Sequence, residues 1–425
     1  MIKRIRYLKV ALIVVLLVQC KVEKKRELIQ RSTDRIDEIY DDLIAVRRDL
    51  HRYPEVSGEE IRTAKIVAHY LRSLGLEVIS NIAGNSVVGI LKGKEKGKRI
   101  AWRADLDAIK IETNDTVHFH SRNKGIAHMC GHDVHTTIGL GIADVLSQEK
   151  ENLKGTVYFI FQASEETFTG ARELVENGLF DSIQPEEIYG LHIGPAEKGI
   201  VNTKVGELFA YEKELQIKFK HEKESIIKNF LSDIMAGFIR NKPNTSPNDL
   251  TYLIDAKVGI EAKETMYTDY FILRNLSTIR KNDLVIGTIN FYETNKERID
   301  LIPLEIQEKI NRSKFKESLI SIKYTGGNPT VYNNKELTKE AFDVLTQVHK
   351  PEQVKPMYGQ IPYFNEDFIY YQQKIPGVFF LLGGSNKEKG IISMPHTPNF
   401  AVDEEVIKIG VNCFSKFILQ RINKQ

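Results

Sequence analysis

The stretch HMCGHDVH, residues 128–135, concentrates side chains that commonly bind transition metals. It holds three of the chain's 11 histidines and one of its three cysteines. Cys130 and His132 are separated only by Gly131, and residues two apart in an extended or turning segment can face the same side. A thiolate and an imidazole together are good zinc ligands. Alone, the stretch leaves three interpretations open: a metal site, a reactive thiol and a polar loop.

Further candidates follow apolar runs. QASEE places Glu165 and Glu166 directly after YFIFQ. Adjacent side chains diverge, so one carboxylate could bind a metal while the other reaches a bound water, although paired glutamates are more often solvated surface. GLHIGP places His192 at the end of another apolar run, where a hydrogen-bonded core histidine is the commoner case. MPHTPNF places His396 between prolines in a loop, and LHRYPEVSGEE and WRADLDAI add further polar candidates.

These candidates need a scaffold that brings strand ends together. Short apolar runs typical of strands alternate with segments of helical periodicity, which predicts an α/β domain with a central mixed sheet flanked by helices. In such sheets, functional residues gather on loops at the carboxyl ends of the strands. The predicted strands are 86–93, 99–107, 155–164 and 187–194, and the predicted helices are 33–50, 58–75, 135–150, 170–180 and 403–420.

A second unit is expected in the middle of the chain. At 425 residues the chain exceeds what one hydrophobic core usually supports. From about residue 212 the pattern changes to that of a smaller α+β unit. Its predicted strands are 214–220, 283–293 and 318–327, and its predicted helices are 225–241 and 297–315. We therefore expect a catalytic domain in two parts, residues 33–211 and 330–425, with a satellite domain inserted at 212–329.

The N-terminus resembles a bacterial lipoprotein signal over residues 1–20. A basic segment, MIKRIRYLK, precedes a short apolar run that ends at Cys20. The run is short for a membrane span, so export with lipidation of Cys20 is expected, and an uncleaved anchor is the alternative. Gln19 departs from the small residue usual before such a cysteine. The lipid anchor would be the only membrane contact, placing the protein in the bacterial cell envelope, and the net charge of +3 argues against a nucleic-acid partner.

The two remaining cysteines have different expected roles. Cys413 lies in VIKIGVNCFSKFIL, an apolar helical pattern, and is expected as a buried core thiol. A single disulfide between Cys413 and Cys130 is the alternative, since exported proteins often carry disulfides.

Taken in order, these motifs resemble the M20 family of metallopeptidases. The subfamily that they resemble comprises amidohydrolases of N-acyl amino acids, hippurate and auxin–amino acid conjugates. The resemblance covers most of residues 40–200 and 355–410. The motifs that carry it are RRDLHRYPEVSGEE, RADLDAI, GIAHMCGHDVHTT, QASEE followed by GARELVENG, GLHIGP, NEDF and MPHTPNF.

The resemblance implies a paired metal centre, usually of zinc or manganese, and a role for each matched position. Glu165 matches the general base on a water activated by both metals, and Asp105 matches an aspartate that orients a ligand or the metal bridge. The matched metal ligands are Cys130, His132, Glu166, His192 and His396. The residues that match other motif positions, with supporting roles, are His51, Asp107, His128, Asp133 and His135.

This chemistry suits hydrolysis of an amide in an N-acyl amino acid or short peptide, a small-molecule substrate. Metals make water nucleophilic at neutral pH, and Glu165 would take its proton and pass it to the leaving amine. A metal-bound Cys130 would be deprotonated, so it would be neither nucleophile nor disulfide partner. A cysteine–histidine hydrolase is the competing interpretation, but it leaves Glu166, His192 and His396 unexplained.

The satellite domain departs from the resemblance. Family members carry a GKGGH motif whose histidine, in homodimers, reaches the partner's active site. Here IKFKHEKESIIKNF has no glycine, Ser225 stands near the histidine position, and His221 is out of register. Asn290 replaces the arginine of the usual GTxR pattern. Oxyanion donors can contribute about 3–4 kcal/mol to catalysis, so either other donors replace them, the substrate differs, or activity is lost. If activity is lost, the alternative function is that of an exported metal-binding protein without hydrolase activity. The loss of GKGGH also weakens the expectation that the chain forms a homodimer.

Overall fold

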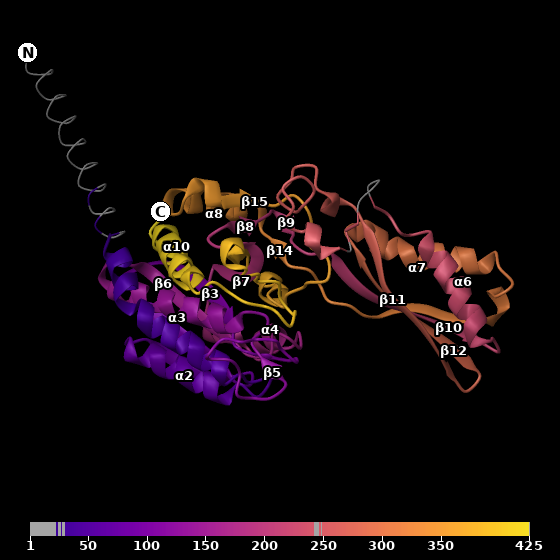
Figure 1. Cartoon of the computed structure of the whole chain (residues 1–425), viewed down its shortest axis with the longest axis horizontal. Helices are drawn as coiled ribbons and strands as arrows, with labels where there is room; N and C mark the ends of the chain where they lie inside the picture. Colours follow the sequence, from indigo (N-terminus) through magenta and orange to yellow (C-terminus); the bar gives the residue numbers. More distant parts are fainter. Residues whose placement is uncertain (1–22, 24–26, 28–29, 242–245, 248, 425) are drawn as a thin grey trace, which may run out of the picture.

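The computed structural model describes residues 23, 27, 30–241, 246–247 and 249–424. The predicted signal peptide lies outside these residues. Within the described part, no helix is both long and apolar enough to cross a membrane. Figure 1 shows a large body that contains both ends of the described chain, and a smaller body beside it.

The large body is built on one mixed sheet of eight strands. In spatial order these are β1 (Glu77–Ile82), β2 (Ser86–Lys92), β6 (Lys154–Gln162), β3 (Glu95–Asp105), β7 (Glu187–Glu197), β16 (Gly377–Ser385), β8 (Val201–Thr203) and β15 (Val354–Pro356). The central neighbours β6, β3, β7 and β16 run parallel, whereas β1, β2 and β6 pair in antiparallel fashion. The sheet is therefore mixed, as predicted.

Helices cover both faces of this sheet. Alternate residues of the strands point to opposite faces, so Trp102 joins one core and Ala101 joins the other. The first face carries the helix described over residues 30–52, together with α2 (Ile61–Ser73), α3 (His132–Gln148), α8 (Lys335–Val348) and α10 (Glu405–Ile422). The second face carries α4 (Gly170–Glu176), α5 (Leu179–Ser182) and α9 (Ile369–Gln372). Cys413 of α10 is a free, fully buried thiol, as expected.

The smaller body is a four-stranded antiparallel sheet with two helices. Its strand order is β11 (Phe271–Lys281), β12 (Leu284–Glu293), β10 (Tyr211–Lys220) and β13 (Leu319–Gly326). The helices α6 (Glu224–Ala236) and α7 (Lys296–Asn311) pack together against this sheet through a shared apolar core (Figure 1). Together the two sheets confirm the predicted fold class, a catalytic α/β unit with a smaller α+β unit.

The structure differs from the sequence-based expectation in three places. The segment between α6 and β11 was expected in the satellite domain, yet Leu253, Ile260 and Met266 pack into the core of the large body. The predicted helix at 170–180 is divided into α4 and α5 because Gly178 adopts a positive φ of 81°. Strands β1, β11 and β16 were not predicted individually.

Candidate metal centre

Strand register explains why distant motifs meet. Asp105 at the end of β3 pairs with Gln162 of β6, and Arg103 pairs with Gly190 of β7. His192 therefore lies level with Asp105, while Glu165 and Glu166 follow β6 at the same edge. This edge is where parallel strands present their carboxyl ends.

The loop before α3 supplies two more side chains at this edge. Gly131 is the N-terminal cap of α3 and adopts a φ of 90°, a conformation that disfavours residues with a Cβ. The turn at Gly131 separates Cys130 in the loop from His132 at the start of the helix. His396, from the loop between β16 and α10, completes the group, and its backbone N–H donates to the carbonyl of Met129 at 2.8 Å.

All five predicted metal ligands come together. The Cys130 Sγ lies 3.2 Å from His192 Nε2 and 3.2 Å from His396 Nε2. His396 Nε2 also lies 3.1 Å from Glu166 Oε1, which in turn is 3.7 Å from His132 Nε2. Side chains from four separate parts of the chain thus aim their ligand atoms at one small volume.

The geometry divides these ligands into two triads that share one sulfur. Cys130, His132 and His192 form one group and Cys130, Glu166 and His396 form another, each with ligand atoms within 4.8 Å of one another. A third group, His132 with Glu165 and Glu166, meets the same limit. Cys130 would therefore help to hold a cation in each of the two triads.

The protonation pattern of the histidines fits metal binding. His192 Nδ1 is 2.7 Å from the carbonyl of Ile193, so it donates there and leaves the Nε2 lone pair aimed at Cys130. His132 Nε2 is buried without a hydrogen-bond partner, while its Nδ1 faces Asp107. An orphaned buried nitrogen aimed at a thiol and carboxylates is a metal-ligand arrangement.

The buried acidic side chains of the site favour the binding of cations. Burial opposes the charged form of His132, but Asp105 and Asp107 outweigh it and raise its pKa to about 10. Burial and the charges of Glu166 and Glu165 raise the pKa of the Cys130 thiol well above its ordinary value. Without a metal, Cys130 would stay protonated and inert, which argues against the cysteine–histidine hydrolase.

The two aspartates of RADLD have different contacts. Asp107 Oδ1 lies 3.3 Å from His132 Nδ1, and its Oδ2 accepts from the backbone N–H of Glu166 at 2.9 Å. Asp105 Oδ1 instead contacts His135 Nδ1 at 2.7 Å, and its Oδ2 accepts from Arg103 at 2.6 Å. Asp107 thus contacts the outer nitrogen of the proposed ligand His132, whereas Asp105 Oδ2 lies 3.7 Å from His132 Nε2. The orienting role expected for Asp105 stays a prediction, and Asp107 is a second candidate for it.

Arg103 is the centre of a buried ion cluster that the sequence did not reveal. Its fully buried guanidinium lies 2.9 Å from Glu366 and 3.0 Å from Asp367, in addition to Asp105. Burial raises the pKa of Glu366 to about 8 and that of Asp367 to about 6, although Arg103 opposes both shifts. Both acids belong to NEDF, a motif quoted for the family but given no role.

The remaining predicted histidines support the site from outside it. His135 Nε2 accepts from the backbone N–H of Ile193 at 2.8 Å, which leaves this histidine no free nitrogen for a metal. His51 bridges Asp133 and Asp115, at 2.8 Å to each. His128 is buried with both ring nitrogens unpartnered among the described residues, and burial lowers its pKa to about 4.

Glu165 stands beside the triads and faces a cavity. Its Oε2 is 3.8 Å from His132 Nε2, and burial together with the charge of Glu366 raises its pKa well above the ordinary value. Left-handed backbone conformations occur on both sides of the site, at Ser164 with φ 59° and at His396 with φ 58°. Such conformations are uncommon for residues other than glycine and tend to occur at functional sites.

The cavity extends from the candidate metal ligands to the smaller body. Its volume is about 330 Å³, and its lining includes Cys130, Glu165 and His396 on one side and Glu212, Arg274 and Tyr292 of the four-stranded sheet on the other. His221, Ser225 and Asn290, the positions that depart from the family motifs, are not among the lining residues. On the satellite-domain side, the cavity is therefore lined by residues other than those at the family's GKGGH and GTxR motif positions.

Comparison with protein families shows which family has this fold and site. The model of peptidase family M20/M25/M40 matches residues 101–420, which contain all the predicted ligands. The chain belongs to this family. Proteins that resemble it include thermostable carboxypeptidase 1 of Saccharolobus solfataricus, 30% identical over 422 residues that cover 94% of this chain and 100% of the relative.

Two other comparisons bear on the chemistry. The N-acetylcysteine deacetylase of Bacillus subtilis is 29% identical, over 88% of this chain and 95% of its own. A solved Bacillus subtilis structure, described as a dinuclear metal binding peptidase, has a TM-score of 0.73 and 25% identity, over 92% of this chain and 100% of its own. This M20 protein is thus a metal-dependent hydrolase of amide or peptide bonds, and its centre is suited to two divalent ions.

Proposed function

We propose that this protein hydrolyses an amide bond in an N-acyl amino acid or short peptide, with Glu165 as the general base. The arrangement that carries the proposal is the buried Glu165 carboxylate beside two triads that share Cys130. Cys130, His132, Glu166, His192 and His396 would hold the two metal ions. Bound metals would lower the pKa of a water molecule and polarise the scissile carbonyl.

The protein's own residues supply the proton transfers. Glu165 takes a proton from the attacking water and delivers it to the leaving nitrogen, because its raised pKa suits a group that must accept and then release a proton. Glu366 and Asp367, held by Arg103, surround Glu165 with negative charge that favours its protonated form. Asp107 holds His132 through Nδ1, which would leave His132 Nε2 to bind a metal ion.

The ligand set favours zinc or manganese. One thiolate, three imidazoles and one carboxylate form a mixed donor set of the kind zinc accepts, and imidazole with carboxylate also suits manganese. The names of relatives, among them deacetylases of N-acetylcysteine and N-acetyldiaminopimelate, support an N-acyl amino acid as the substrate class.

The direct test is turnover by reconstituted protein. The purified chain would be stripped with a chelator, reloaded with Zn²⁺ or Mn²⁺, and assayed against N-acyl amino acids and dipeptides. Activity that disappears on chelation and returns with metal supports the proposal. Tight metal binding with no turnover across the panel would favour the alternative, a metal-binding protein without hydrolase activity, for which the missing GKGGH motif is the motivating observation.

We also propose export to the bacterial cell envelope with a lipid on Cys20. The basic segment and short apolar run before Cys20 support this proposal. Incorporation of labelled palmitate that is lost in a Cys20→Ala variant would test it, and soluble wild-type protein without label would refute it. A homodimer is a further expectation, weakened by the loss of GKGGH.

A further inference from the structure

One end of the large body is rich in lysine. Two segments meet there, residues 92–98 (KGKEKGK) and 150–154 (KENLK), which together hold six lysines and two glutamates. The backbone N–H of Lys94 donates to the carbonyl of Lys150 at 3.2 Å, so the two segments are in contact. The net charge of the whole chain is only +3. Positive charge is therefore concentrated on these two segments, which we call the lysine surface.

Ion pairs balance only part of the charge of the lysine surface. Four glutamates each lie within 3.7 Å of one of its lysines, and these are Glu77, Glu95, Glu151 and Glu187. Glu187 is shared with Arg421, which lies 2.8 Å from it. Lys96 and Lys150 are exposed and have no ion-pair partner among the residues that the structure describes. The surface therefore keeps a positive charge that faces solvent.

The helix described over residues 30–52 begins beside the lysine surface. Arg31 donates two hydrogen bonds to Glu149, at 2.9 and 3.1 Å, and Glu149 directly precedes the second lysine segment. Cys20, the proposed site of the lipid, lies ten residues before Gln30. A chain of ten residues spans at most about 35 Å. A lipid on Cys20 would therefore hold this end of the large body close to the bilayer.

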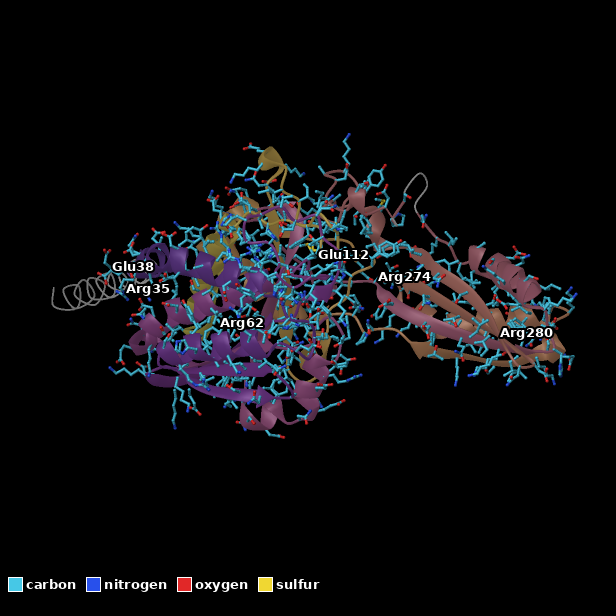
Figure 2. All side chains as sticks on the ribbon, turned by 60° about the horizontal axis from the view of Figure 1, so that its bottom comes forward. Arg35, Glu38, Arg62, Glu112, Arg274 and Arg280 are labelled. Atoms are coloured by element: carbon cyan, nitrogen blue, oxygen red, sulfur yellow. The ribbon has the colours of Figure 1, made fainter. Side chains whose placement is uncertain are left out.

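The candidate metal centre lies at the other end of the same sheet. β6 begins at Lys154, in the lysine surface, and ends at Gln162, which pairs with Asp105. A strand of this length spans roughly 25–30 Å. Figure 2 shows Arg35, of the helix that begins at the lysine surface, at one end of the large body, and Arg274, which lines the cavity, where the two bodies meet. A body that rests on a bilayer through its lysine surface would direct its cavity away from that bilayer.

We propose that the lysine surface binds the headgroups of anionic phospholipids, so that the enzyme stands on the membrane with its cavity facing away from it. Exposed lysines are attracted by a negatively charged bilayer, but the attraction falls off within about 10 Å at 0.1 M salt. The lipid on Cys20 would supply the proximity that such a short-range attraction needs, and a basic surface strengthens a lipid anchor. In the cell the inference rests on the proposed anchor, whereas the binding of lipid by the surface can be tested without it.

Sedimentation with vesicles tests the surface alone. The chain from residue 21 onward contains all three apolar cores, so it folds without the signal segment. We expect it to bind vesicles of equal parts phosphatidylglycerol and phosphatidylcholine at low salt, and to dissociate as salt is raised. The variant Lys96→Glu/Lys150→Glu should bind about tenfold more weakly or worse.

A matched control makes the same change of charge on the smaller body. Lys228 and Lys281 are exposed there and, within the described residues, have no ion-pair partner. The variant Lys228→Glu/Lys281→Glu should therefore bind as wild type does. No binding by wild type, equal binding to pure phosphatidylcholine, or equal losses in the two variants would overturn the proposal. Loss of palmitate labelling at Cys20 with vesicle binding intact would remove the anchor and leave the surface supported.

A fluorescent label shows which end of the protein meets the bilayer. Cys130 and Cys413 are buried, so a thiol-reactive dye would label an exposed cysteine introduced by Lys96→Cys or by Lys281→Cys. In the same anionic vesicles, with a quencher attached to the lipid headgroups, we expect quenching of the dye at position 96 and little at position 281. Equal quenching at both positions, or quenching at position 281 alone, would contradict the proposed orientation. Neither measurement depends on turnover, so its outcome is independent of the amidohydrolase function.

Discussion

Asp107 contacts His132 through one carboxylate oxygen, with Oδ1 3.3 Å from Nδ1, and binds the backbone N–H of Glu166 through the other. One side chain thus orients two proposed ligands. Burial would raise the pKa of Asp107, but the hydrogen bond and charge of His132 outweigh it and lower that pKa. Asp107 is therefore anionic at neutral pH and fixes the His132 tautomer that can bind a metal.

Removal of this charge should weaken metal binding. We expect Asp107→Asn to lower the affinity for Zn²⁺ by about 10- to 100-fold, the usual effect of losing a carboxylate behind a histidine ligand. Competition with a chromophoric chelator measures it. Asp105→Asn is the comparison, since Asp105 contacts His135 and Arg103 but no proposed ligand's outer nitrogen. A larger loss of affinity in Asp105→Asn than in Asp107→Asn would assign the orienting role to Asp105.

Glu165 should control turnover but not metal content. We expect Glu165→Gln to lower kcat by about 10²- to 10⁴-fold, because a neutral amide cannot accept the water's proton. Metal analysis of the same preparation should match wild type, since the proposed ligands remain. Glu173→Gln, an exposed change on α4, is the control and should keep full activity. Wild-type turnover by Glu165→Gln would disprove the mechanism.

Arg103 should be more important for stability than its neighbours on β3. Arg103→Met leaves three carboxylates buried without their cation, and breaking such a cluster costs about 3–5 kcal/mol. Denaturant unfolding of the metal-loaded protein measures the loss. Arg99→Met is the matched control on the same strand, because Arg99 forms an exposed pair with Glu186, and its effect should stay within about 0.5 kcal/mol. Equal losses in both variants would show that the buried cluster relaxes by protonation.

The His51 pairs predict a defined pH dependence of stability. Burial and Arg47 oppose the charged form of His51, but Asp133 and Asp115 outweigh them and raise its pKa above 6.5. The folded protein then binds the extra proton, so the stabilisation is full below pH 6.5 and is lost as pH rises through the folded pKa. The difference in unfolding free energy between wild type and His51→Gln should shrink over that range.

A second histidine provides a control of opposite sign. Burial lowers the pKa of His349, whose Nε2 lies 2.7 Å from the carbonyl of Gly199. Here the unfolded chain binds the proton more readily, so wild type should lose stability relative to His349→Gln as pH falls below 6.5. Urea titrations at matched metal loading from pH 5.5 to 8.5 would measure both variants. Parallel pH profiles for the two would contradict the assignments.

Local signals explain why the ligand set was predictable. Cys130 and His132 share one short motif, and Glu166 and His192 directly follow or end apolar runs whose strand character is plain in the sequence. Parallel neighbours then bring those ends to one edge. This rule of sheet topology accounts for the strand-end positions, whereas the full set of five proposed ligands, including His396 in its loop, came from the resemblance to the M20 family.

The rest of the site depends on pairing between distant segments. Asp105 ends β3 and Asp107 follows two residues later, and only the folded structure shows that Asp107 Oδ1 lies 3.3 Å from His132 Nδ1 while Asp105 Oδ2 lies 3.7 Å from His132 Nε2. Arg274 reaches the cavity because of a bulge in β11, a strand whose polar alternation hid it from prediction. No local pattern contains that pairing information.

Ser164 and His396 both have a left-handed backbone conformation, but only Ser164 can be replaced by glycine without loss of a candidate metal ligand. A residue with a Cβ in this conformation costs about 1–2 kcal/mol that glycine avoids. Glycine at position 164 keeps the backbone N–H that donates to Glu60, so thermal tolerance could be gained there without touching a metal ligand. At position 396 the same exchange would relieve an identical backbone penalty and delete an imidazole. The two positions have nearly the same φ, but glycine at position 164 would raise stability without removing a candidate ligand, whereas glycine at position 396 would raise stability at the expense of catalysis.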